Sequence, residues 1–374
     1  MLPLTERMLA TMVSDQIEPD SVEIVLVQHL LSDTEEFVRL IRGFGFKILR
    51  IIGIEYSSRP DVVERLRSSG IDVVVPKVGA TEDALRQVLQ DQLSRSQSNR
   101  IILQEVGGYC ANILNAVVEL RGRDRFLGVI EETRHGLWRY RDVSDFPIPV
   151  IEIADSFLKS LEARYVGEAV ARAVEFDLLE AGSTLWGAKS VVLGFGDVGS
   201  SVANGLRVRG SFVSCFDPDP LKLIYARMLG FRSPDRQRLL SDADIVVGAS
   251  GKRSVTDQDL EALADGVMLA SASSKDVEFP IDFIRSTATH RHVITAYVNE
   301  YTMPWGKRIR VSSEGHPINF RGFSLPHFMS DLLFAQIVAA MQMLLSVRPS
   351  NQIHGLSKEH QVHIASEWLD VYRH

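Results

Sequence analysis

Residues Lys189–Leu193 form a short, largely apolar run that leads directly into Gly194-Phe195-Gly196-Asp197-Val198-Gly199, after which a helical pattern begins. Strand, G-x-G-x-x-G turn and helix in this order are typical of dinucleotide-binding units. The first glycine permits the tight turn, the second lets the backbone approach a pyrophosphate, and the third lets the helix pack on the strand. The phosphates would rest on the N–H groups at the beginning of the helix.

The next strand adds an acid at the position that such a unit requires. Phe212–Phe216 is a second apolar run, and it ends at Asp217. An acid at this point accepts a hydrogen bond from the adenosine ribose 2′-OH, and it would repel a 2′-phosphate. The sequence therefore predicts a Rossmann domain that binds NAD in preference to NADP. The glycines alone would leave a structural turn as the alternative.

The composition is that of a soluble globular protein. Of 374 residues, 45% are hydrophobic and 24% are charged. A chain of this length exceeds the usual size of one core, which predicts two domains. The 41 Lys and Arg against 48 Asp and Glu give a net charge of −7, which argues against nucleic acid or an anionic membrane as the main partner.

Cysteine usage and the N-terminus bear on the compartment. The only cysteines, Cys110 and Cys215, lie far apart and have no metal-ligand spacing, which predicts a reducing compartment and no metal site. Met1–Arg7 has no basic stretch followed by an apolar core, and no run of 18 apolar residues occurs. We expect a cytoplasmic protein that does not span a membrane.

The first third of the chain alternates strand and helix patterns, which predicts a parallel sheet covered on both faces. Ser32 and Glu35 have the spacing of a capping box. The predicted strands are Val22–Val27, Phe46–Ile54, Ile71–Pro76 and Arg100–Gln104, and the predicted helices run from Ser32 to Gly43, over Pro60–Arg67 and from Thr81.

A second βα series follows a predicted strand at Pro147–Ile153. Asp155-Ser156 would cap a long helix whose buried stripe is Phe157, Leu161, Tyr165, Ala169 and Ala173. Beyond the glycine motif we expect strands at Asp244–Ala249, Gly266–Ala270 and His292–Ala296, a helix opened by Thr256, and an apolar helix, Met329–Leu345, that packs across the domain junction. The predicted fold class is α/β, with two doubly wound parallel-sheet domains.

Four further blocks, in addition to the glycine motif, carry a family resemblance. They are Gly128–Thr133 (GVIEET), Asp155–Ser160 (DSFLKS), Ser313–Asn319 (SEGHPIN) and Met329–Asp331 (MSD). They resemble the blocks GISEET, DSVTKS, AEGRLVN and MSN of the S-adenosylhomocysteine hydrolases, whose glycine motif reads GYGDVG. The order of the blocks is preserved over roughly residues 20–345.

The resemblance implies a domain division. Residues 1–160 would form a substrate-binding α/β domain, completed by about 325–347. Residues 161–324 would form the NAD-binding Rossmann domain, and 348–374 a C-terminal tail. The family's core contacts would make the protein a homo-oligomer, a dimer or a tetramer.

The resemblance also implies a chemistry and the residues that perform it. In this family a bound NAD oxidises the 3′-hydroxyl of a nucleoside ribose, which acidifies C4′–H so that the 5′ thiol is eliminated and water adds. Glu132 matches the carboxylate that holds the ribose hydroxyls. Lys159 matches the base that takes the hydroxyl proton, and a place in the first turn of a helix would lower its pKa. The residues that match NAD contacts are Gly194, Gly196, Asp197, Val198, Gly199, Asp217, Ser250, Gly251, Asn319 and Thr133.

Several residues of the family's acid–base machinery are missing. The family's DDGGD reads Glu105-Val106-Gly107-Gly108-Tyr109 here, so an aspartate has become valine. Other polar or histidine positions carry Ala154, Ala163-Arg164 and Ser273-Ser274-Lys275. His29 ends the first strand where a family histidine stands. The other candidate replacements are Glu105, His135, Lys275 and His327, while Arg134 and Lys275 would suit a phosphate or carboxylate on the substrate.

Three hypotheses remain at this point. The first is an NAD-dependent enzyme that oxidises a ribose-type hydroxyl of a nucleoside or a related sugar through Lys159 and Glu132. The second is a genuine S-adenosylhomocysteine hydrolase with substituted acid–base residues. The third is an NAD-binding pseudoenzyme with a regulatory role. A generic 2-hydroxyacid dehydrogenase is less favoured because its Arg/Glu/His constellation is not recognisable.

Overall fold

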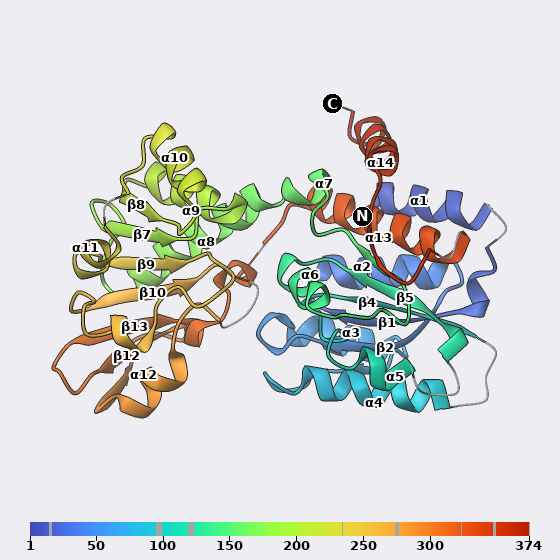
Figure 1. Cartoon of the computed structure of the whole chain (residues 1–374), viewed down its shortest axis with the longest axis horizontal. Coiled ribbons are helices and arrows are strands. Elements are labelled where there is room, and N and C mark those ends of the chain that lie inside the picture. Colours follow the sequence, from blue (N-terminus) through green and yellow to red (C-terminus); the bar gives the residue numbers. More distant parts are fainter. Residues whose placement is uncertain are drawn as a thin grey trace. The chain divides into compact units, whose positions relative to one another are not determined.

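The computed structural model describes residues 1–14, 17–94, 99–118, 123–233, 235–273, 277–322, 324–346 and 349–373. The chain divides into two compact units. Unit 1 comprises Met1–Leu161 and Pro326–His374, and unit 2 comprises Glu162–Leu325. Each unit is built around its own seven-stranded sheet (Figure 1).

The sheet of unit 1 is parallel throughout, in the order β14-β6-β5-β4-β1-β2-β3. Its strands are β1 (Val22–Gln28), β2 (Lys47–Gly53), β3 (Val73–Val74), β4 (Arg100–Glu105), β5 (Phe126–Glu131), β6 (Val150–Glu152) and β14 (Ile353–Gly355). All seven residues of β1 and all six of β5 are buried, as expected for strands covered on both faces. The chain proceeds from β1 to β3 on one side and from β4 to β6 on the other, so the strand order reverses between β1 and β4.

Helices cover both faces of this sheet. They are α1 (Pro3–Ser14), α2 (Ser32–Gly43), α3 (Pro60–Ser68), α4 (Thr81–Ser94), α5 (Leu114–Val118), α6 (Arg134–Arg141), α7 (Phe157–Ser160), α13 (His327–Ser346) and α14 (Lys358–Val371). The predicted capping box of α2 is wrong, because Leu31 occupies the N-cap position and no side chain caps the helix.

The apolar helix α13 belongs to the core of unit 1. It packs on α1, α2, β5, β6, α7 and α14, which all belong to unit 1. Figure 1 shows α13 beside α1, although they come from opposite ends of the sequence. Among the described residues it is the one helix long and apolar enough for a membrane span, yet 78% of its most apolar window is buried. Packing inside the unit accounts for its composition.

The two termini are held together at Asp331, which lies on α13 and is fully buried. Its carboxylate accepts the backbone N–H groups of Leu4 and Thr5, each at 2.8 Å, and the hydroxyl of Tyr372 at 2.8 Å. Residues beyond 348, which were expected as a tail, add β14 to the sheet and α14 to the helices of unit 1.

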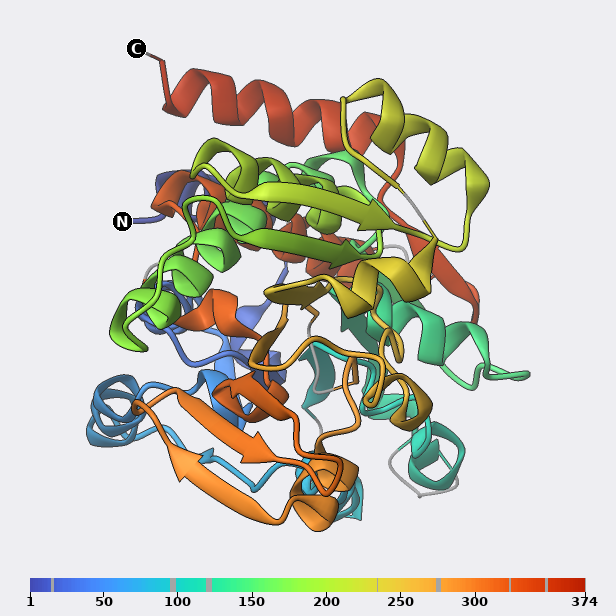
Figure 2. The ribbon, with the colours of Figure 1, turned by 90° about the vertical axis from the view of Figure 1, so that its left-hand side faces the viewer.

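The sheet of unit 2 has the order β11-β12-β13-β10-β9-β7-β8. Its strands are β7 (Lys189–Leu193), β8 (Phe212–Phe216), β9 (Ile245–Gly248), β10 (Val267–Ser271), β11 (His290–Val293), β12 (Val298–Thr302) and β13 (Arg308–Ser312). Five strands are parallel, β12 pairs antiparallel with β13, and β11 pairs antiparallel with β12. The orange ribbon at the bottom of Figure 2 contains this antiparallel part. The strand order reverses between β7 and β9.

Successive residues of the strands in unit 2 point to opposite faces of the sheet and so belong to two separate hydrophobic cores. Val192 faces the core shared with α8 (Ala163–Glu180) and α9 (Asp197–Val208), whereas Val191 and Leu193 face the core shared with α11 (Arg236–Ser241) and α12 (Ile281–Thr287). Helix α10 (Pro220–Met228) follows β8. The doubly wound prediction is confirmed in both units. The helix expected after Thr256 is only a 3₁₀ turn, Asp257–Asp259.

Candidate functional site

The glycine loop of unit 2 shows why Gly194 and Gly199 are needed, and it leaves open space at Gly196. Gly194 has φ +99°, and a Cβ there would lie 2.5 Å from the carbonyl oxygen of Ala249. A Cβ on Gly199 would overlap the carbonyl oxygen of Gly194, so the helix could not approach the loop. Gly196 is the N-cap of α9, and a Cβ there would meet nothing within 4 Å. This open space lies at the helix N-terminus, where a pyrophosphate would bind.

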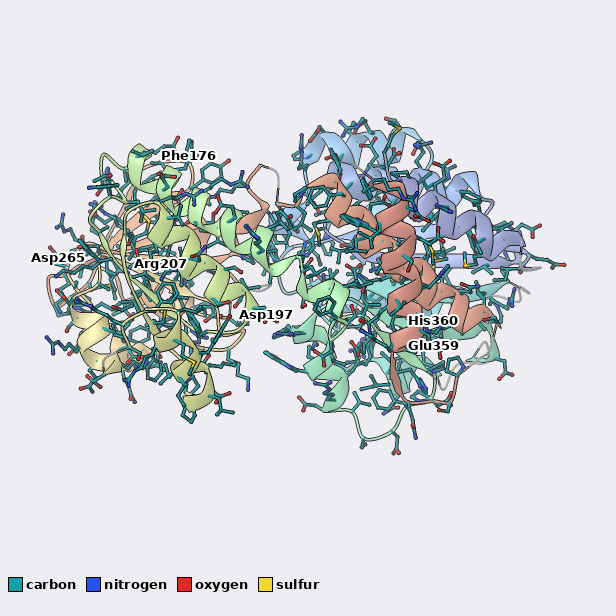
Figure 3. All side chains as sticks on the ribbon, turned by 90° about the horizontal axis from the view of Figure 1, so that it is seen from above. Phe176, Asp197, Arg207, Asp265, Glu359 and His360 are labelled. Atoms are coloured by element: carbon teal, nitrogen blue, oxygen red, sulfur yellow. The ribbon has the colours of Figure 1, made fainter. Side chains whose placement is uncertain are left out.

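Two other residues of the motif lie at the same helix start. Asp197 is exposed in the first turn of α9, where Figure 3 labels it, and Val198 is half-buried. Phe195, within the loop, anchors it to the core: the residue is 2% exposed and its ring packs edge-to-face with the rings of Tyr225 and Phe231. The loop is thus fixed by packing before any ligand binds.

Asp217 lies directly after β8, as predicted, and its carboxylate is buried beside the glycine loop. Oδ2 accepts the backbone N–H of Phe195 at 2.7 Å, and Oδ1 accepts that of Asp219 at 2.9 Å. The acid therefore both orders the loop and stands at the end of the strand where an adenosine ribose would lie.

The loop after β9 contains the predicted contacts Ser250 and Gly251, and it is organised by an acid that the sequence did not indicate. Glu278 is fully buried. Its Oε1 accepts the backbone N–H groups of Ser250 and Gly251, each at 2.7 Å, and its Oε2 accepts the Ser250 hydroxyl at 2.8 Å. Because these N–H and hydroxyl groups already donate hydrogen bonds to Glu278, the loop would contact a cofactor mainly through van der Waals packing.

Asn319 is also buried, and its side-chain amide donates to Ser324 Oγ at 3.2 Å. The segment before it is strained, since Ser313 and Glu314 have φ +48° and +54°. The Glu314 carboxylate stabilises this conformation by accepting from Tyr301 OH at 3.1 Å and by pairing with Arg285. A tight loop is thereby held close to Asn319.

These features meet at the carboxyl ends of β7 and β9, where the strand order reverses. Open α/β sheets bind their ligands at such a switch point. The open space at Gly196, the helix start beside it and the acid after β8 together fit a dinucleotide. Among the described residues, no group of three His, Cys, Asp or Glu side chains could hold a metal ion.

In unit 1 the carboxyl ends of three neighbouring strands place polar side chains around Glu132. This residue follows β5 and is 6% exposed. Its Oε1 accepts the side-chain amide of Gln28, from the end of β1, at 2.5 Å, and also that of Gln104 from β4. Because β1 and β4 flank the point where the strand order reverses, Glu132 lies where this second sheet would bind a ligand. The two glutamines were not predicted.

His29 follows β1, as the sequence indicated, and is anchored on both sides. Its backbone N–H donates to Gln28 Oε1 at 2.8 Å, and its ring Nδ1 lies 2.5 Å from Ser57 Oγ. The surrounding protein, together with the positive charge of Lys159, lowers the pKa of His29 to about 3. The ring is therefore neutral at physiological pH and can serve as a hydrogen-bond acceptor.

This low pKa predicts an acid-sensitive contribution to stability. An unfolded histidine takes up a proton near pH 6.5, whereas the folded one does so only near pH 3. The contribution is therefore present above pH 6.5 and is lost as the pH falls below it. We expect wild type to lose more unfolding free energy between pH 7.5 and 5 than His29→Gln, as measured by urea denaturation.

The control is His363→Gln on the exposed surface of α14, which should behave as wild type. NMR of the His29 ring should show a neutral imidazole throughout this range. A ring that becomes charged near pH 6 would contradict the assignment.

Lys159 is half-buried and lies on α7, a helix of only four residues. The predicted long helix is wrong, because the hydrogen-bond pattern is interrupted after Ser160 and resumes in α8 at Ala163. The predicted stripe is wrong at its beginning too, since Phe157 is 64% and Leu161 40% exposed. The cap is as expected: Ser156 Oγ accepts the Lys159 N–H at 3.0 Å, and its own hydroxyl donates to the buried Gln336 of α13.

Glu105 has a structural role, contrary to its proposed use as an acid–base group. It is fully buried. It accepts the backbone N–H of Tyr109 at 2.8 Å, that of Cys110 at 3.2 Å, and the hydroxyl of Tyr140. Burial raises its pKa above the usual range. Because the protein itself surrounds this carboxylate, we remove Glu105 from the candidate set.

Glu131 and Thr133 likewise shape the loops of unit 1. Glu131 accepts the N–H of Gly108 at 2.8 Å and the Thr133 hydroxyl at 2.6 Å, and burial raises its pKa to about 8. Thr133 Oγ1 also caps α6 by accepting the Gly136 N–H at 3.0 Å. The structure thus gives Thr133, expected as an NAD contact, a local role in unit 1.

The remaining replacement candidates are dispersed. His327 pairs with Asp33 at 2.7 Å, Arg134 lies 3.5 Å from Asp155, and the His135 ring is near Trp138. Lys275 and Ser274 lie outside the described residues. Three positions where the resemblance expects polar groups carry buried apolar side chains, namely Val106, Ala154 and Ala163.

Comparison with known proteins agrees with this geometry. Residues 171–324 match the family model for the NAD-binding domain of S-adenosyl-L-homocysteine hydrolase. An adenosylhomocysteinase of Thermotoga maritima is 29% identical over 353 residues, which cover 91% of this chain and 85% of that protein. The chain is therefore similar to adenosylhomocysteinases over most of its length, and residues 171–324 match the NAD-binding domain model of these enzymes.

Other similarities are more distant. An S-inosyl-L-homocysteine hydrolase of Methanopyrus kandleri is 27% identical over 337 residues, covering 87% of this chain and 77% of that protein. Among solved structures, a dipicolinate synthase of Bacillus halodurans is 11% identical, with a TM-score of 0.45 over 86% of this chain and 98% of that one. The family's cofactor is NAD, and this chain's glycine loop and Asp217 fit it.

Proposed function

We propose that the protein is an NAD-dependent enzyme that oxidises a ribose-type hydroxyl of a nucleoside or a related sugar. The observation that carries the proposal is the cluster of Glu132, Gln28, Gln104 and His29 at the switch point of the sheet in unit 1. It accompanies a dinucleotide site in unit 2 that retains its glycines and its acid.

The residues of unit 1 would divide the work as follows. Glu132, whose Oε1 is held by two amide donors, accepts a substrate hydroxyl and fixes its direction. Lys159, in its neutral form, takes the proton of that hydroxyl and becomes an ammonium group, and this positive charge lowers the pKa of His29, whose ring stays neutral. NAD, when bound, accepts the hydride. The contact between His29 Nδ1 and Ser57 Oγ offers a second place to relay a proton.

The same structure does not favour the later steps of hydrolysis. Val106, Ala154 and Ala163 cannot transfer protons, and each is at most 5% exposed. General acids and bases are each worth about 10²–10⁴ in rate. We therefore propose oxidation as the main reaction, with elimination of a 5′ thiol slow or absent.

Two measurements test the proposal. The purified chain is denatured, and the released small molecules are identified by mass spectrometry; a nucleoside or its 3′-keto form is expected. Adenosine, its 5′-substituted relatives and its 5′-phosphates are then screened for absorbance at about 340 nm, which reports NADH. If none of these compounds produced NADH, the protein would be interpreted as a binding protein. If S-adenosylhomocysteine instead released its thiol at about 10 s⁻¹, the protein would be a hydrolase.

Glu132→Gln should weaken substrate binding and lower the rate together. The substitution preserves the shape of the side chain but removes the charge that accepts the hydroxyl, and its amide would face the donors of Gln28 and Gln104. We expect about a 10²-fold fall in kcat/KM, equivalent to roughly 2.7 kcal/mol. Glu152→Gln, from the end of β6, is a control in the same sheet. An unchanged kcat/KM in Glu132→Gln would contradict the role.

A further inference from the structure

A lysine stands beside the acid that marks the adenosine end of the NAD site. Lys222 Nζ lies 3.6 Å from Asp217 Oδ2. The two side chains differ in exposure, since Lys222 is 46% exposed and Asp217 only 5%. The carboxylate thus faces the protein through its backbone donors and meets an ammonium group that extends toward solvent.

The local backbone fixes this pairing. Asp217 directly follows β8, Asp219 caps α10 by accepting the Leu221 N–H at 2.9 Å, and Lys222 lies in the first turn of α10. The backbone positions of both members of the pair are therefore set by one short turn. No interaction with unit 1 is needed to place it.

The charges near this turn oppose one another. Asp217 and Asp219 would repel a 2′-phosphate on the adenosine ribose, whereas Lys222 would attract it. A lysine binds phosphate as a compact point charge. One opposite charge at about 4 Å, partly screened by solvent, is worth roughly a tenfold change in affinity. Asp217 alone would therefore give a stronger preference for NAD than the pair gives.

We propose that Lys222 is a specificity-determining residue that admits the 2′-phosphate of NADP and so narrows the preference for NAD imposed by Asp217. The inference requires only that the glycine loop and Asp217 bind the adenine half of a dinucleotide. It is independent of the oxidation proposed above, and an inactive but cofactor-binding protein would test it equally well.

The test is calorimetric titration of the full-length chain with NAD and with NADP, after its nucleotide content has been measured by mass spectrometry. For wild type, the Kd for NADP should exceed that for NAD by about tenfold. Lys222→Met should raise this ratio about tenfold further, mainly by weakening NADP, and Lys222→Arg should keep the wild-type ratio. NADP binding should also lose its extra salt dependence in Lys222→Met.

A matched control is Lys189→Met. Lys189 is a similarly exposed lysine of unit 2, paired with Asp242 at 2.5 Å near the amino end of β7. It should leave both affinities unchanged. An unchanged NADP:NAD ratio in Lys222→Met would overturn the proposal, and so would an equal shift in Lys189→Met, because the effect would then be one of net charge.

Discussion

Replacement of Lys159 by methionine is expected to lower the rate at which bound NAD is reduced by about 10²- to 10⁴-fold, the usual worth of a general base. Methionine has roughly the volume of lysine but cannot take a proton. The helix that carries Lys159 is held independently of its side chain, because Ser156 bonds Gln336 and the Phe157 N–H donates to Gln361 at 2.9 Å. The variant should therefore remain folded, and the loss should appear in the chemical step.

The measurement is single-turnover reduction of NAD, followed at about 340 nm with the substrate found by the screen. Lys77→Met is the control, since Lys77 is an exposed lysine of the same unit that pairs with Glu55 at 2.7 Å. A second readout is the ring of His29, whose pKa should rise when the nearby positive charge is removed. If Lys159→Met reduced NAD at the wild-type rate, Lys159 could not be the base, and another group would have to take the hydroxyl proton.

The sequence predicted the strands around the glycine motif well, because their apolar runs are short and bounded by turn residues. The limits of β7 and β8 are those expected, and α2 ends at Gly43 as expected. The long helix after Ser156 was wrong for a physical reason: Leu161 and Glu162 keep right-handed helical dihedrals, so no breaker marks the interruption of the hydrogen bonds. Apolar spacing alone could not show that Phe157 and Leu161 face outward.

Site residues could be predicted from the sequence where the residue type at that position has one usual role. They were missed where the role of the side chain depends on neighbours that only the folded chain brings close. Glycines and the acid after β8 could be assigned from spacing. Gln28 and Gln104 could not, because only the folded sheet brings both amides onto Glu132. Glu105 is the converse case. The sequence suggested an acid–base group at the end of a strand, but its carboxylate accepts backbone N–H groups of the loop that follows. Neither case leaves a local signal in the sequence.

Gly196→Val is expected to abolish NAD binding while leaving unit 2 folded. Gly196 has φ −79° and ψ −165°, which valine can adopt, and a Cβ there meets nothing within 4 Å. The free energy of unfolding of the nucleotide-free protein should therefore change by no more than about 0.5 kcal/mol. The added methyl groups would occupy the space through which a pyrophosphate approaches the N-terminus of α9, so the affinity for NAD should fall at least about 10²-fold.

Gly199→Ala should behave differently, and this contrast makes the prediction specific. Its Cβ would overlap the carbonyl oxygen of Gly194, so α9 would have to move and unfolding should become easier by about 1–3 kcal/mol. Gly43→Val at the end of α2, where a Cβ also meets nothing within 4 Å, is the control in unit 1 and should retain NAD affinity. Calorimetry and urea denaturation of the three variants separate the two effects. NAD affinity preserved in Gly196→Val would show that the dinucleotide does not approach this loop.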